Sequence, residues 1–360
     1  MKLHLIAGAR PNFLKIASLC NSIRKGHDKI QFKLIHTGQH FDKNLSQIFF
    51  TELNIPKPNI NLNCGGGSSV EQISKIMISY EKYIKNNIPD FLIVVGDVNS
   101  TIACSIVAKT FGVSVVHVEA GIRSFDISMP EEINRILTDS ITDYAFVTSK
   151  NAKKNLIKSG FQKNNIFFVG NTMVDTLLSN LNKFKKPTLF DDCNLKSKNY
   201  FVLTLHRPSN VDNKLILSKL LNYFNKKLNN YKIIFPVHPR TKKNIDNNIK
   251  YENIIFCDPM GYLEFNFIVN NSFAVITDSG GITEETTIMN IPCLTIRENT
   301  ERPETINKGT NELIGIDINK YDIYFNRLFS GKWKSGKSPK LWDGKTGDRI
   351  IKKLIQIFNK

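Results

Sequence analysis

The chain has 360 residues, and its hydrophobic fraction of 41% is enough for two buried cores and argues against a disordered chain. Its formal net charge of +17 comes largely from lysines dispersed among asparagines and isoleucines, whereas a nucleic-acid-binding surface gathers Arg, Lys and aromatic residues together. The cysteines are scattered without metal-ligand spacing and no apolar run suits a signal peptide or a membrane span, so we expect a cytoplasmic protein without a metal site.

The first half of the chain alternates short apolar, β-branched runs with longer helical patterns. Such alternation is typical of βαβ units, and runs without polar positions indicate strands covered on both faces. Strands are expected at residues 3–8, 32–38, 91–97, 113–119, 144–149 and 166–170. Helices are expected at 11–24, 43–53, 70–86, 100–111, 131–142 and 150–159, with Ser68 or Ser69 capping the third.

The second half repeats the alternation, which predicts a second α/β domain. Its strands are expected at 200–206, 231–238, 253–257, 273–281 and 291–297. The polar stretch 172–199 separates the halves, so the predicted domains are residues 1–171 and 172–344, each Rossmann-like with a parallel sheet. Apolar residues share one helical face over 350–358, so the C-terminal helix (345–360) is expected to pack back on the first domain.

Ligands of open α/β sheets bind beyond the carboxyl ends of the strands. In GARPNFLK, Arg10 stands at the start of a predicted helix, where the helix dipole disfavours a cation. An anion held by the free N–H groups of the helix would explain Arg10 and Lys15 as clamps; the alternative is that both reach solvent or a carboxylate. Arg302, just before Pro303, repeats this arrangement.

The stretch AVITDSGGITEE runs from a strand through Ser279, Gly280 and Gly281 into a helix. Glycines let the backbone approach a phosphate closely, and the helix start supplies N–H donors. Beside such a cradle, Glu285 is placed to accept both hydroxyls of a ribose, whereas Glu284 fits a carboxylate that complements the helix dipole.

Two histidines follow neighbouring strands of the second half. His206 precedes Arg207 in VLTLHRPSN, and Arg240 follows His238 closely in FPVHPRT. A single histidine at a strand end is more often structural, but two of them with arginines nearby favour an anionic ligand.

Acidic residues end two strands of the first half, Asp97 in FLIVVGD and Glu119 in VSVVHVE. In a positively lined cleft such carboxylates would be tuned for acid/base chemistry, although either could instead cap the following helix. The sequence SMPE (128–131) fits a capping box, which would make Glu131 structural. Glu132 is spaced to pair with Arg135 at the surface.

Eight blocks of the sequence resemble the UDP-N-acetylglucosamine 2-epimerase family, most closely its non-hydrolysing branch, and stand in the same order. They are GARPNFLKIA, HTGQHFD, VVGDVNST, HVEAGIRSFDISMPEEINR, VGNTMVDTL, LTLHRPSN, DSGGITEE and ENTERPETINKGTN, within residues 3–315. The resemblance implies two Rossmann-like domains facing each other across a cleft, as in GT-B glycosyltransferases, with UDP bound by the C-terminal domain. It also implies a homodimer that needs no cofactor.

The family's reaction removes UDP from C1 and the proton from C2 to give 2-acetamidoglucal, then returns both with inversion at C2. The resemblance places the catalytic positions on Asp97, Glu119, Glu131 and His206. It places the UDP-binding positions on Arg10, Lys15, Ser279, Gly280, Glu285 and Arg302, beside which Gly281, His238 and Arg240 are further candidates. For Glu131 we therefore follow the resemblance and not the capping box.

The leading hypothesis is a non-hydrolysing epimerase that makes UDP-N-acetylmannosamine for surface polysaccharide. The segment between Glu119 and Glu131 is shorter than in some bacterial members, so a related substrate such as a UDP-2,3-diacetamido uronic acid stays open. A hydrolysing epimerase, a glycosyltransferase and a basic nucleic-acid-binding protein compete with this hypothesis. The sequence GQHFDKN (38–44) lacks the longer polar motif of substrate-activated members, which argues against activation by UDP-N-acetylglucosamine.

Overall fold

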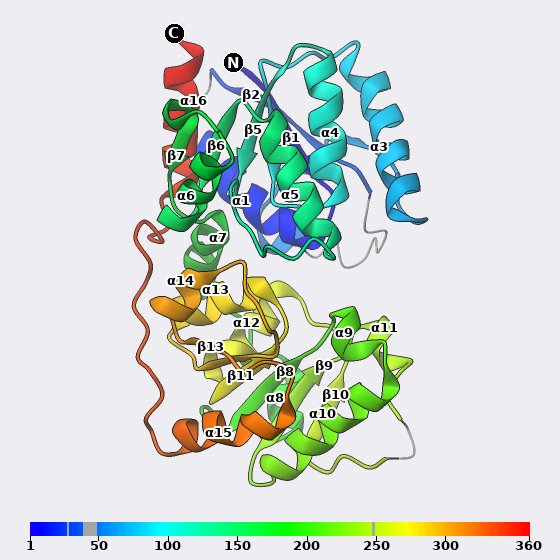
Figure 1. Cartoon of the computed structure of the whole chain (residues 1–360), viewed down its shortest axis with the longest axis vertical. Coiled ribbons are helices and arrows are strands. Elements are labelled where there is room, and N and C mark those ends of the chain that lie inside the picture. The colour runs from blue at the N-terminus through cyan, green and yellow to red at the C-terminus, as the bar shows by residue number, and fades with distance from the viewer. Residues whose placement is uncertain (27–28, 39–48, 247–248) are drawn as a thin grey trace. The chain divides into compact units, whose positions relative to one another are not determined.

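The structure is a computed structural model that describes residues 1–26, 29–38, 49–246 and 249–360. The chain divides into two compact units, one formed by Met1–Ser179 with Lys340–Lys360 and the other by Asn180–Pro339 (Figure 1). Within the described residues, no helix combines the length and the apolar character that crossing a bilayer requires.

The described part of the first unit contains a parallel sheet in the order β3-β2-β1-β4-β5-β6-β7. In chain order its strands are β1 (Lys2–Ala7), β2 (Gln31–His36), β3 (Ile60–Asn61), β4 (Phe91–Val95), β5 (Ser114–Val118), β6 (Tyr144–Val147) and β7 (Ile166–Phe168). β4 is buried along its whole length, as its continuous apolar run predicted. The strand order reverses between β1 and β4, which is where open α/β sheets bind ligands.

Helices of the first unit pack against this sheet and against one another. They are α1 (Arg10–Arg24), α3 (Ser69–Ile84), α4 (Asn99–Thr110), α5 (Pro130–Ile141), α6 (Lys150–Lys158), α7 (Thr172–Asn180) and α16 (Thr346–Phe358). Helices α3, α4 and α5 lie side by side, and α16 lies against α1 (Figure 1). Ser68 caps α3 by accepting from the Glu71 N–H at 3.2 Å, as one of the two predicted caps.

The C-terminal helix is joined to the first unit through Asp175 of α7. One oxygen of this buried carboxylate accepts from the Ser18 hydroxyl of α1 and from the Gly347 N–H of α16, both at 2.8 Å. Ile350, Ile351 and Leu354 of α16 are buried, whereas Ile355 is partly buried and Phe358 is exposed. Residues 172–179 therefore belong to the first compact unit, whereas the sequence-based boundary stood before them.

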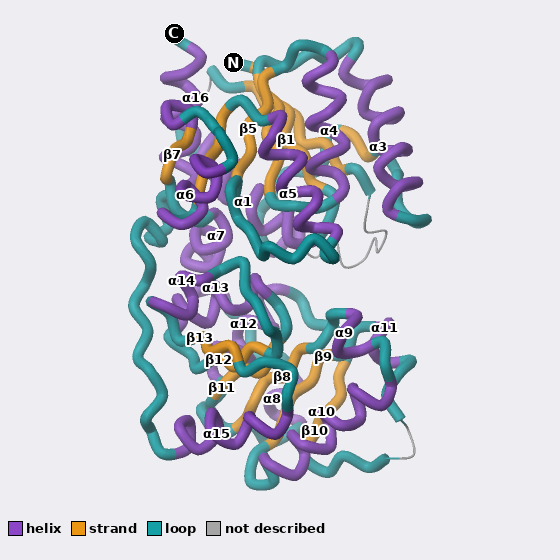
Figure 2. Tube along the Cα trace, in the orientation of Figure 1, coloured by secondary structure: helices purple, strands orange, loops and turns teal. Residues whose placement is uncertain are grey.

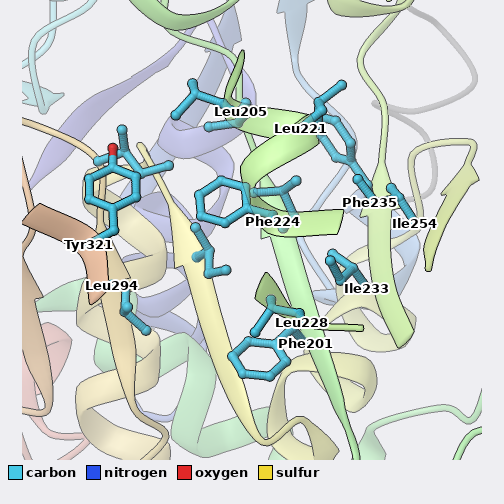
Figure 3. Close-up of a cluster of buried hydrophobic side chains, with 14 of the residues drawn as sticks. Phe201, Leu205, Leu221, Phe224, Leu228, Ile233, Phe235, Ile254, Leu294 and Tyr321 are labelled. Atoms are coloured by element: carbon cyan, nitrogen blue, oxygen red, sulfur yellow. The ribbon is translucent and has the colours of Figure 1, made fainter. Parts of the chain in front are cut away.

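The second unit repeats the arrangement with a parallel sheet in the order β10-β9-β8-β11-β12-β13. Its strands are β8 (Tyr200–Thr204), β9 (Lys232–Pro236), β10 (Ile254–Cys257), β11 (Ala274–Thr277), β12 (Cys293–Thr295) and β13 (Asn311–Leu313). Its helices are α8 (Thr188–Asp192), α9 (Pro208–Val211), α10 (Lys214–Lys227), α11 (Pro239–Lys242), α12 (Tyr262–Asn271), α13 (Gly280–Met289), α14 (Pro303–Asn307) and α15 (Tyr321–Phe329). Phe201, Phe224, Phe235 and Tyr321 fill its core (Figure 3).

Most predicted elements are present within one to three residues of their expected bounds. Figure 2 shows where the helices and strands lie along the chain. The prediction missed β3, β13, α7 and α8, and it gave no bounds for the helices of the second unit. The strand expected over 273–281 ends at Thr277 because a helix begins at Gly280. Much of the helix expected over 43–53, and most of the GQHFDKN segment, lie outside the described residues.

Candidate active site

Two carboxylates follow adjacent parallel strands of the first unit. β4 and β5 pair with Val95 opposite Val118, so Asp97 and Glu119 lie at the same edge of the sheet. The Gly96 N–H donates to the Val118 carbonyl at 3.1 Å and links the two turns. The predicted placement of both acids at one edge is confirmed, while their chemical roles stay predictions.

Glu119 has an unusual backbone conformation. Its φ of +74° lies in the left-handed region, which is unfavourable by about 1–2 kcal/mol for a residue other than glycine. Its side chain is buried, and its carboxylate forms an ion pair with Lys15 Nζ. Backbone strain at a buried charged group is typical of residues positioned for chemistry.

Lys15 lies against the carboxylate of Glu119. From the sequence alone, contact with a carboxylate was the alternative to binding an anion. The side chain is buried, and a Cβ on Gly96 would stand 2.6 Å from Lys15 Nζ, so the glycine leaves room for the ammonium group. The ion pair compensates the charge of Glu119 inside the protein. Binding of a substrate anion by Lys15 remains a prediction.

Arg10 is the first residue of α1 and is followed by Pro11, as predicted. Its guanidinium carbon lies 6.0 Å from the centre of the Phe49 ring, within reach of a cation–π interaction. Asn12 Oδ1 accepts from the N–H groups of Gly8 and Ala9 at 3.2 and 3.0 Å and so fixes the approach to the helix. Arg10 is therefore held half buried beside the reversal in strand order.

Arg135 connects Asp97 to Glu132. Its Nε and Nη2 donate to Asp97 Oδ2 at 2.8 and 2.6 Å, and its Nη1 donates to Glu132 Oε2 at 2.7 Å. Glu132 is 1% exposed. The predicted pairing of Glu132 with Arg135 is confirmed, but the prediction that it lies at the surface is wrong, because the helix turns this face toward the protein.

The predicted capping box at residues 128–131 is wrong. Pro130 occupies the first position of α5, where its fixed φ suits a helix start, so Met129 is the N-cap and Glu131 is at the second position instead of the third. Glu131 is exposed, and no hydrogen bond or ion pair joins it to another of the described residues. Helix capping therefore no longer competes with a catalytic role for Glu131.

A buried pair, His117 and Asp139, was missed at the sequence level. His117 Nδ1 lies 2.7 Å from Asp139 Oδ1, and the other carboxylate oxygen accepts from the Gly121 N–H and pairs with Arg123. Burial alone would raise the pKa of Asp139, but the hydrogen bond and charge of His117, together with Arg123, lower it. The pair ties the turn after Glu119 to α5. Its sequence signal is the spacing of Glu132, Arg135 and Asp139 on one helical face.

In the second unit, His206 and Asp278 follow the two strands at which the strand order reverses. His206 Nδ1 lies 2.7 Å from the buried Asp278 carboxylate, which also accepts from the N–H groups of His206 and Arg207. Burial alone would raise the pKa of Asp278, but the hydrogen bond and charge of His206 and the Arg207 N–H lower it. The His206 side chain is 54% exposed, so its ring is oriented by a carboxylate and accessible at its other side. Asp278 was not predicted.

His238 follows β9, which pairs with β8, so it lies at the same sheet edge as His206, as predicted. The imidazole of His238 is exposed. Arg240 lies in α11, but its side chain is outside the described part of the structure.

The glycine-rich turn leads into α13 as predicted, with Ser279 as N-cap and Gly280 as first helical residue. Ser279 donates its N–H to the Thr277 hydroxyl at 3.0 Å, and Gly281 continues the first turn. The dipole hypothesis required Glu284 to stand in the first turn of α13, but it lies beyond that turn. Glu284 is fully buried and forms an ion pair with Arg302. That hypothesis is therefore wrong.

Glu285 is buried one residue beyond this ion pair. Burial raises the pKa of Glu285 to about 7, with the charge of Glu284 adding to the shift and hydrogen bonding by Tyr262 and Asn266 opposing it. A carboxyl group whose pKa is raised to about 7, beside a glycine-rich helix start, is typical of a binding site. Arg302 is the N-cap of α14, directly before Pro303, as predicted.

Comparison with known proteins agrees with the resemblance. The family model for UDP-N-acetylglucosamine 2-epimerase matches residues 23–355. The curated UDP-N-acetylglucosamine 2-epimerase of Methanocaldococcus jannaschii is 42% identical over 98% of this chain and 99% of the relative. A UDP-2,3-diacetamido-2,3-dideoxy-D-glucuronate 2-epimerase of Pseudomonas aeruginosa is 38% identical over 88% of each chain.

Among solved structures, that of Methanocaldococcus jannaschii UDP-GlcNAc 2-epimerase in complex with UDP-GlcNAc and UDP matches with a TM-score of 0.91. It is 41% identical and covers 99% of this chain and 100% of the other. Together with the two parallel sheets, this match confirms the predicted α/β fold class with two Rossmann-like units. The chain belongs to the UDP-N-acetylglucosamine 2-epimerase family.

Proposed function

We propose that the protein converts UDP-N-acetylglucosamine to UDP-N-acetylmannosamine by inverting C2, without net hydrolysis. The observation that carries the proposal is the pair of carboxylates, Asp97 and Glu119, at adjacent strand ends of a chain 42% identical to a UDP-N-acetylglucosamine 2-epimerase. A carboxylate pair suits a reaction that removes a proton from one face of a carbon and returns one to the other.

The C2 proton of the sugar is only weakly acidic, because C2 is not next to a carbonyl group. UDP must therefore leave C1 before this proton can be removed. Breakage of the C1–O bond sends its electron pair to UDP, and loss of the C2 proton to a carboxylate then forms the C1–C2 double bond of 2-acetamidoglucal. An acid returns a proton to the opposite face of C2, and a UDP oxygen bonds to C1 again. No water or redox partner is consumed.

The first unit supplies the acids in this proposal. Glu119, strained and paired with Lys15, and Asp97, held by Arg135, act on the C2 proton together with the exposed Glu131. Because the Lys15–Glu119 pair is buried, removal of the ammonium group would leave an uncompensated charge beside the substrate.

The second unit binds UDP in this proposal. The N–H groups of Gly280 and Gly281 at the start of α13 and the Ser279 hydroxyl meet the pyrophosphate, and Glu285 accepts the ribose hydroxyls. His206, oriented by Asp278, donates to the departing UDP oxygen. Arg302, His238 and Arg240 are further cations of this unit that would attract the pyrophosphate, and Arg10 is a candidate phosphate contact of the first unit.

We also propose a cytoplasmic homodimer whose product feeds surface polysaccharide synthesis. The α5 helix exposes Ile133, Ile136 and Leu137 on one face. The α3 helix, which is separated from α5 by α4, exposes Val70 and Ile78. The three exposed apolar residues on one face of α5 favour a subunit interface at this helix. Light scattering should give twice the chain mass, and Leu137→Lys should lower it.

Incubation with UDP-N-acetylglucosamine in deuterated water, followed by NMR, tests the function. We expect UDP-N-acetylmannosamine with deuterium at C2. Free N-acetylmannosamine with UDP would instead identify a hydrolysing enzyme. An unchanged substrate would overturn the assignment and favour the diacetamido uronic acid substrate named for the Pseudomonas aeruginosa relative, which the same assay then examines.

A further inference from the structure

The segment between Glu119 and α5 is anchored by one buried carboxylate. Glu132 Oε2 accepts from the N–H and the hydroxyl of Ser124 at 2.9 and 3.1 Å, and its Oε1 accepts from the Phe125 N–H at 3.1 Å. Phe125 has a φ of +60° and a side chain that is 76% exposed. Phe125 thus holds an unfavourable conformation that burial of its own side chain does not explain, and Glu132 supplies acceptors for the backbone at this point.

The same helix also holds the turn that carries Asp97. Arg135 donates twice to Asp97 Oδ2, and Asn134 Nδ2 donates to the Asp97 carbonyl at 3.0 Å and to Asn99 Oδ1 at 3.2 Å. Both the side chain and the backbone of Asp97 are therefore bound to α5. Because Arg135 also donates to Glu132, one guanidinium group connects the candidate acid to the anchored segment.

Burial makes this connection stiff. The side chains of Glu132 and Arg135 are 1% and 4% exposed, whereas that of Asp97 is 25% exposed. One guanidinium group between two carboxylates leaves a net charge of −1, which the donors of Ser124 and Phe125 stabilise at Glu132, and removal of the guanidinium group would leave Glu132 buried without a counter-ion. Asp97 is the member of the three that reaches solvent, so it is the end available to a substrate.

We propose that Glu132 and Arg135 are positioning residues, which fix the Asp97 carboxylate and the segment 120–129 as one body. The inference rests on the proposed catalytic role of Asp97. Neither residue needs to touch the sugar: Arg135 sets the direction of the acid, and Glu132 sets the position of Arg135 and of the segment. Their loss should therefore reduce kcat while the binding of UDP, assigned to the second unit, is kept.

The substitution Glu132→Gln tests this coupling. An amide has one acceptor oxygen, so either the Phe125 N–H or the Ser124 and Arg135 donors lose their partner, and the amide N–H₂ faces another donor. A misplaced catalytic group lowers the rate by about 100-fold for a displacement of about 1 Å. We expect kcat to fall about 10- to 100-fold, with KM and the Kd of UDP within about 3-fold of wild type.

The experiment compares kcat, KM, deuterium entry at C2, the Kd of UDP and hydrogen exchange by mass spectrometry. Glu81→Gln on α3 is the matched control, since Glu81 is 46% exposed in a surface pair with Lys85 and should change none of these. Glu132→Gln should also speed amide exchange in 120–129 and around Asp97 together. Arg135→Lys is the second variant: it keeps the positive charge but loses the planar guanidinium group that donates to both carboxylates. It tests the same coupling if Glu132→Gln does not fold.

A kcat within 2-fold of wild type in a folded variant, or exchange that rises in 120–129 but not around Asp97, would overturn the coupling. An equal loss of UDP binding would also overturn it, because that indicates general damage. Failure of the wild-type protein to act on UDP-N-acetylglucosamine contradicts the proposed function alone, since hydrogen exchange tests the coupling without substrate.

Discussion

In the absence of ligand, the substitution Glu285→Gln should stabilise the protein relative to wild type more at pH 8 than at acidic pH. Glu285 is buried beside the Glu284 carboxylate, and its pKa is raised from 4.5 to about 7. Between these two values the folded protein keeps a proton that the unfolded chain has released, so the free energy of unfolding falls as the pH rises. The loss is complete above pH 7.

The size of this effect follows from the two pKa values. One pKa unit corresponds to 1.36 kcal/mol, so the wild type should lose about 3 kcal/mol between pH 4.5 and pH 8 through this one group. Glutamine does not ionise, and its amide can still bond with Tyr262 and Asn266. The stability difference between Glu285→Gln and wild type should therefore grow by about 3 kcal/mol in favour of the variant over this range.

Urea unfolding at pH 5 and pH 8, followed by circular dichroism, measures this difference. Glu252→Gln is the control, because Glu252 is an exposed carboxylate of the same unit. A stability difference that does not change with pH, or that moves against the variant at pH 8, would refute the role of burial at Glu285.

Three further predictions concern the candidate acids, the histidine pair and acid stability. Glu131→Gln should leave stability within about 0.5 kcal/mol of wild type, because Glu131 is exposed, yet lower turnover at least 100-fold; near-normal turnover in the NMR assay would remove it from the catalytic set. Asp278→Asn should lower kcat about 100-fold by releasing the His206 ring, measured at saturating substrate, whereas an unchanged kcat would show that the pair is structural. Burial and the charge of Lys33 lower the pKa of His4 to about 4, so stability should fall by about 3 kcal/mol between pH 6.5 and pH 4, where the unfolded chain binds a proton that the folded protein excludes. His4→Gln should reduce this acid sensitivity in urea unfolding, and an identical pH profile would contradict it.

The fold was largely predictable because buried parallel strands are continuous apolar runs. What was missed lacks that signal: β3 and β13 are two and three residues long, and α7 begins the stretch 172–199, whose later part KFKKPTLFDDCNLKSKN (183–199) is polar and resembles a linker. Asp175 shows why composition misled, since its partners Ser18 and Gly347 are far away in the sequence.

The candidate site was predictable where strand ends define it, as for Asp97, Glu119 and His206. The supporting residues were not, because their partners come from other strands and helices. Spacing indicated the pair of Glu132 with Arg135 but not its burial, which depends on how α5 is rotated against the sheet. Asp278 looked like part of a glycine-rich turn until the structure placed it against His206.

The left-handed backbone at Glu119 has a consequence for directed evolution. Glycine adopts this conformation freely and asparagine more easily than glutamate, but either alone would leave the buried Lys15 ammonium group without its counter-ion, which costs more than the backbone relief. A library screened only for survival of heating should therefore accumulate Gly or Asn at position 119 only together with an uncharged residue at position 15, and such double variants should lose turnover. Thermostable variants of this chain should be sought with turnover measured in every round.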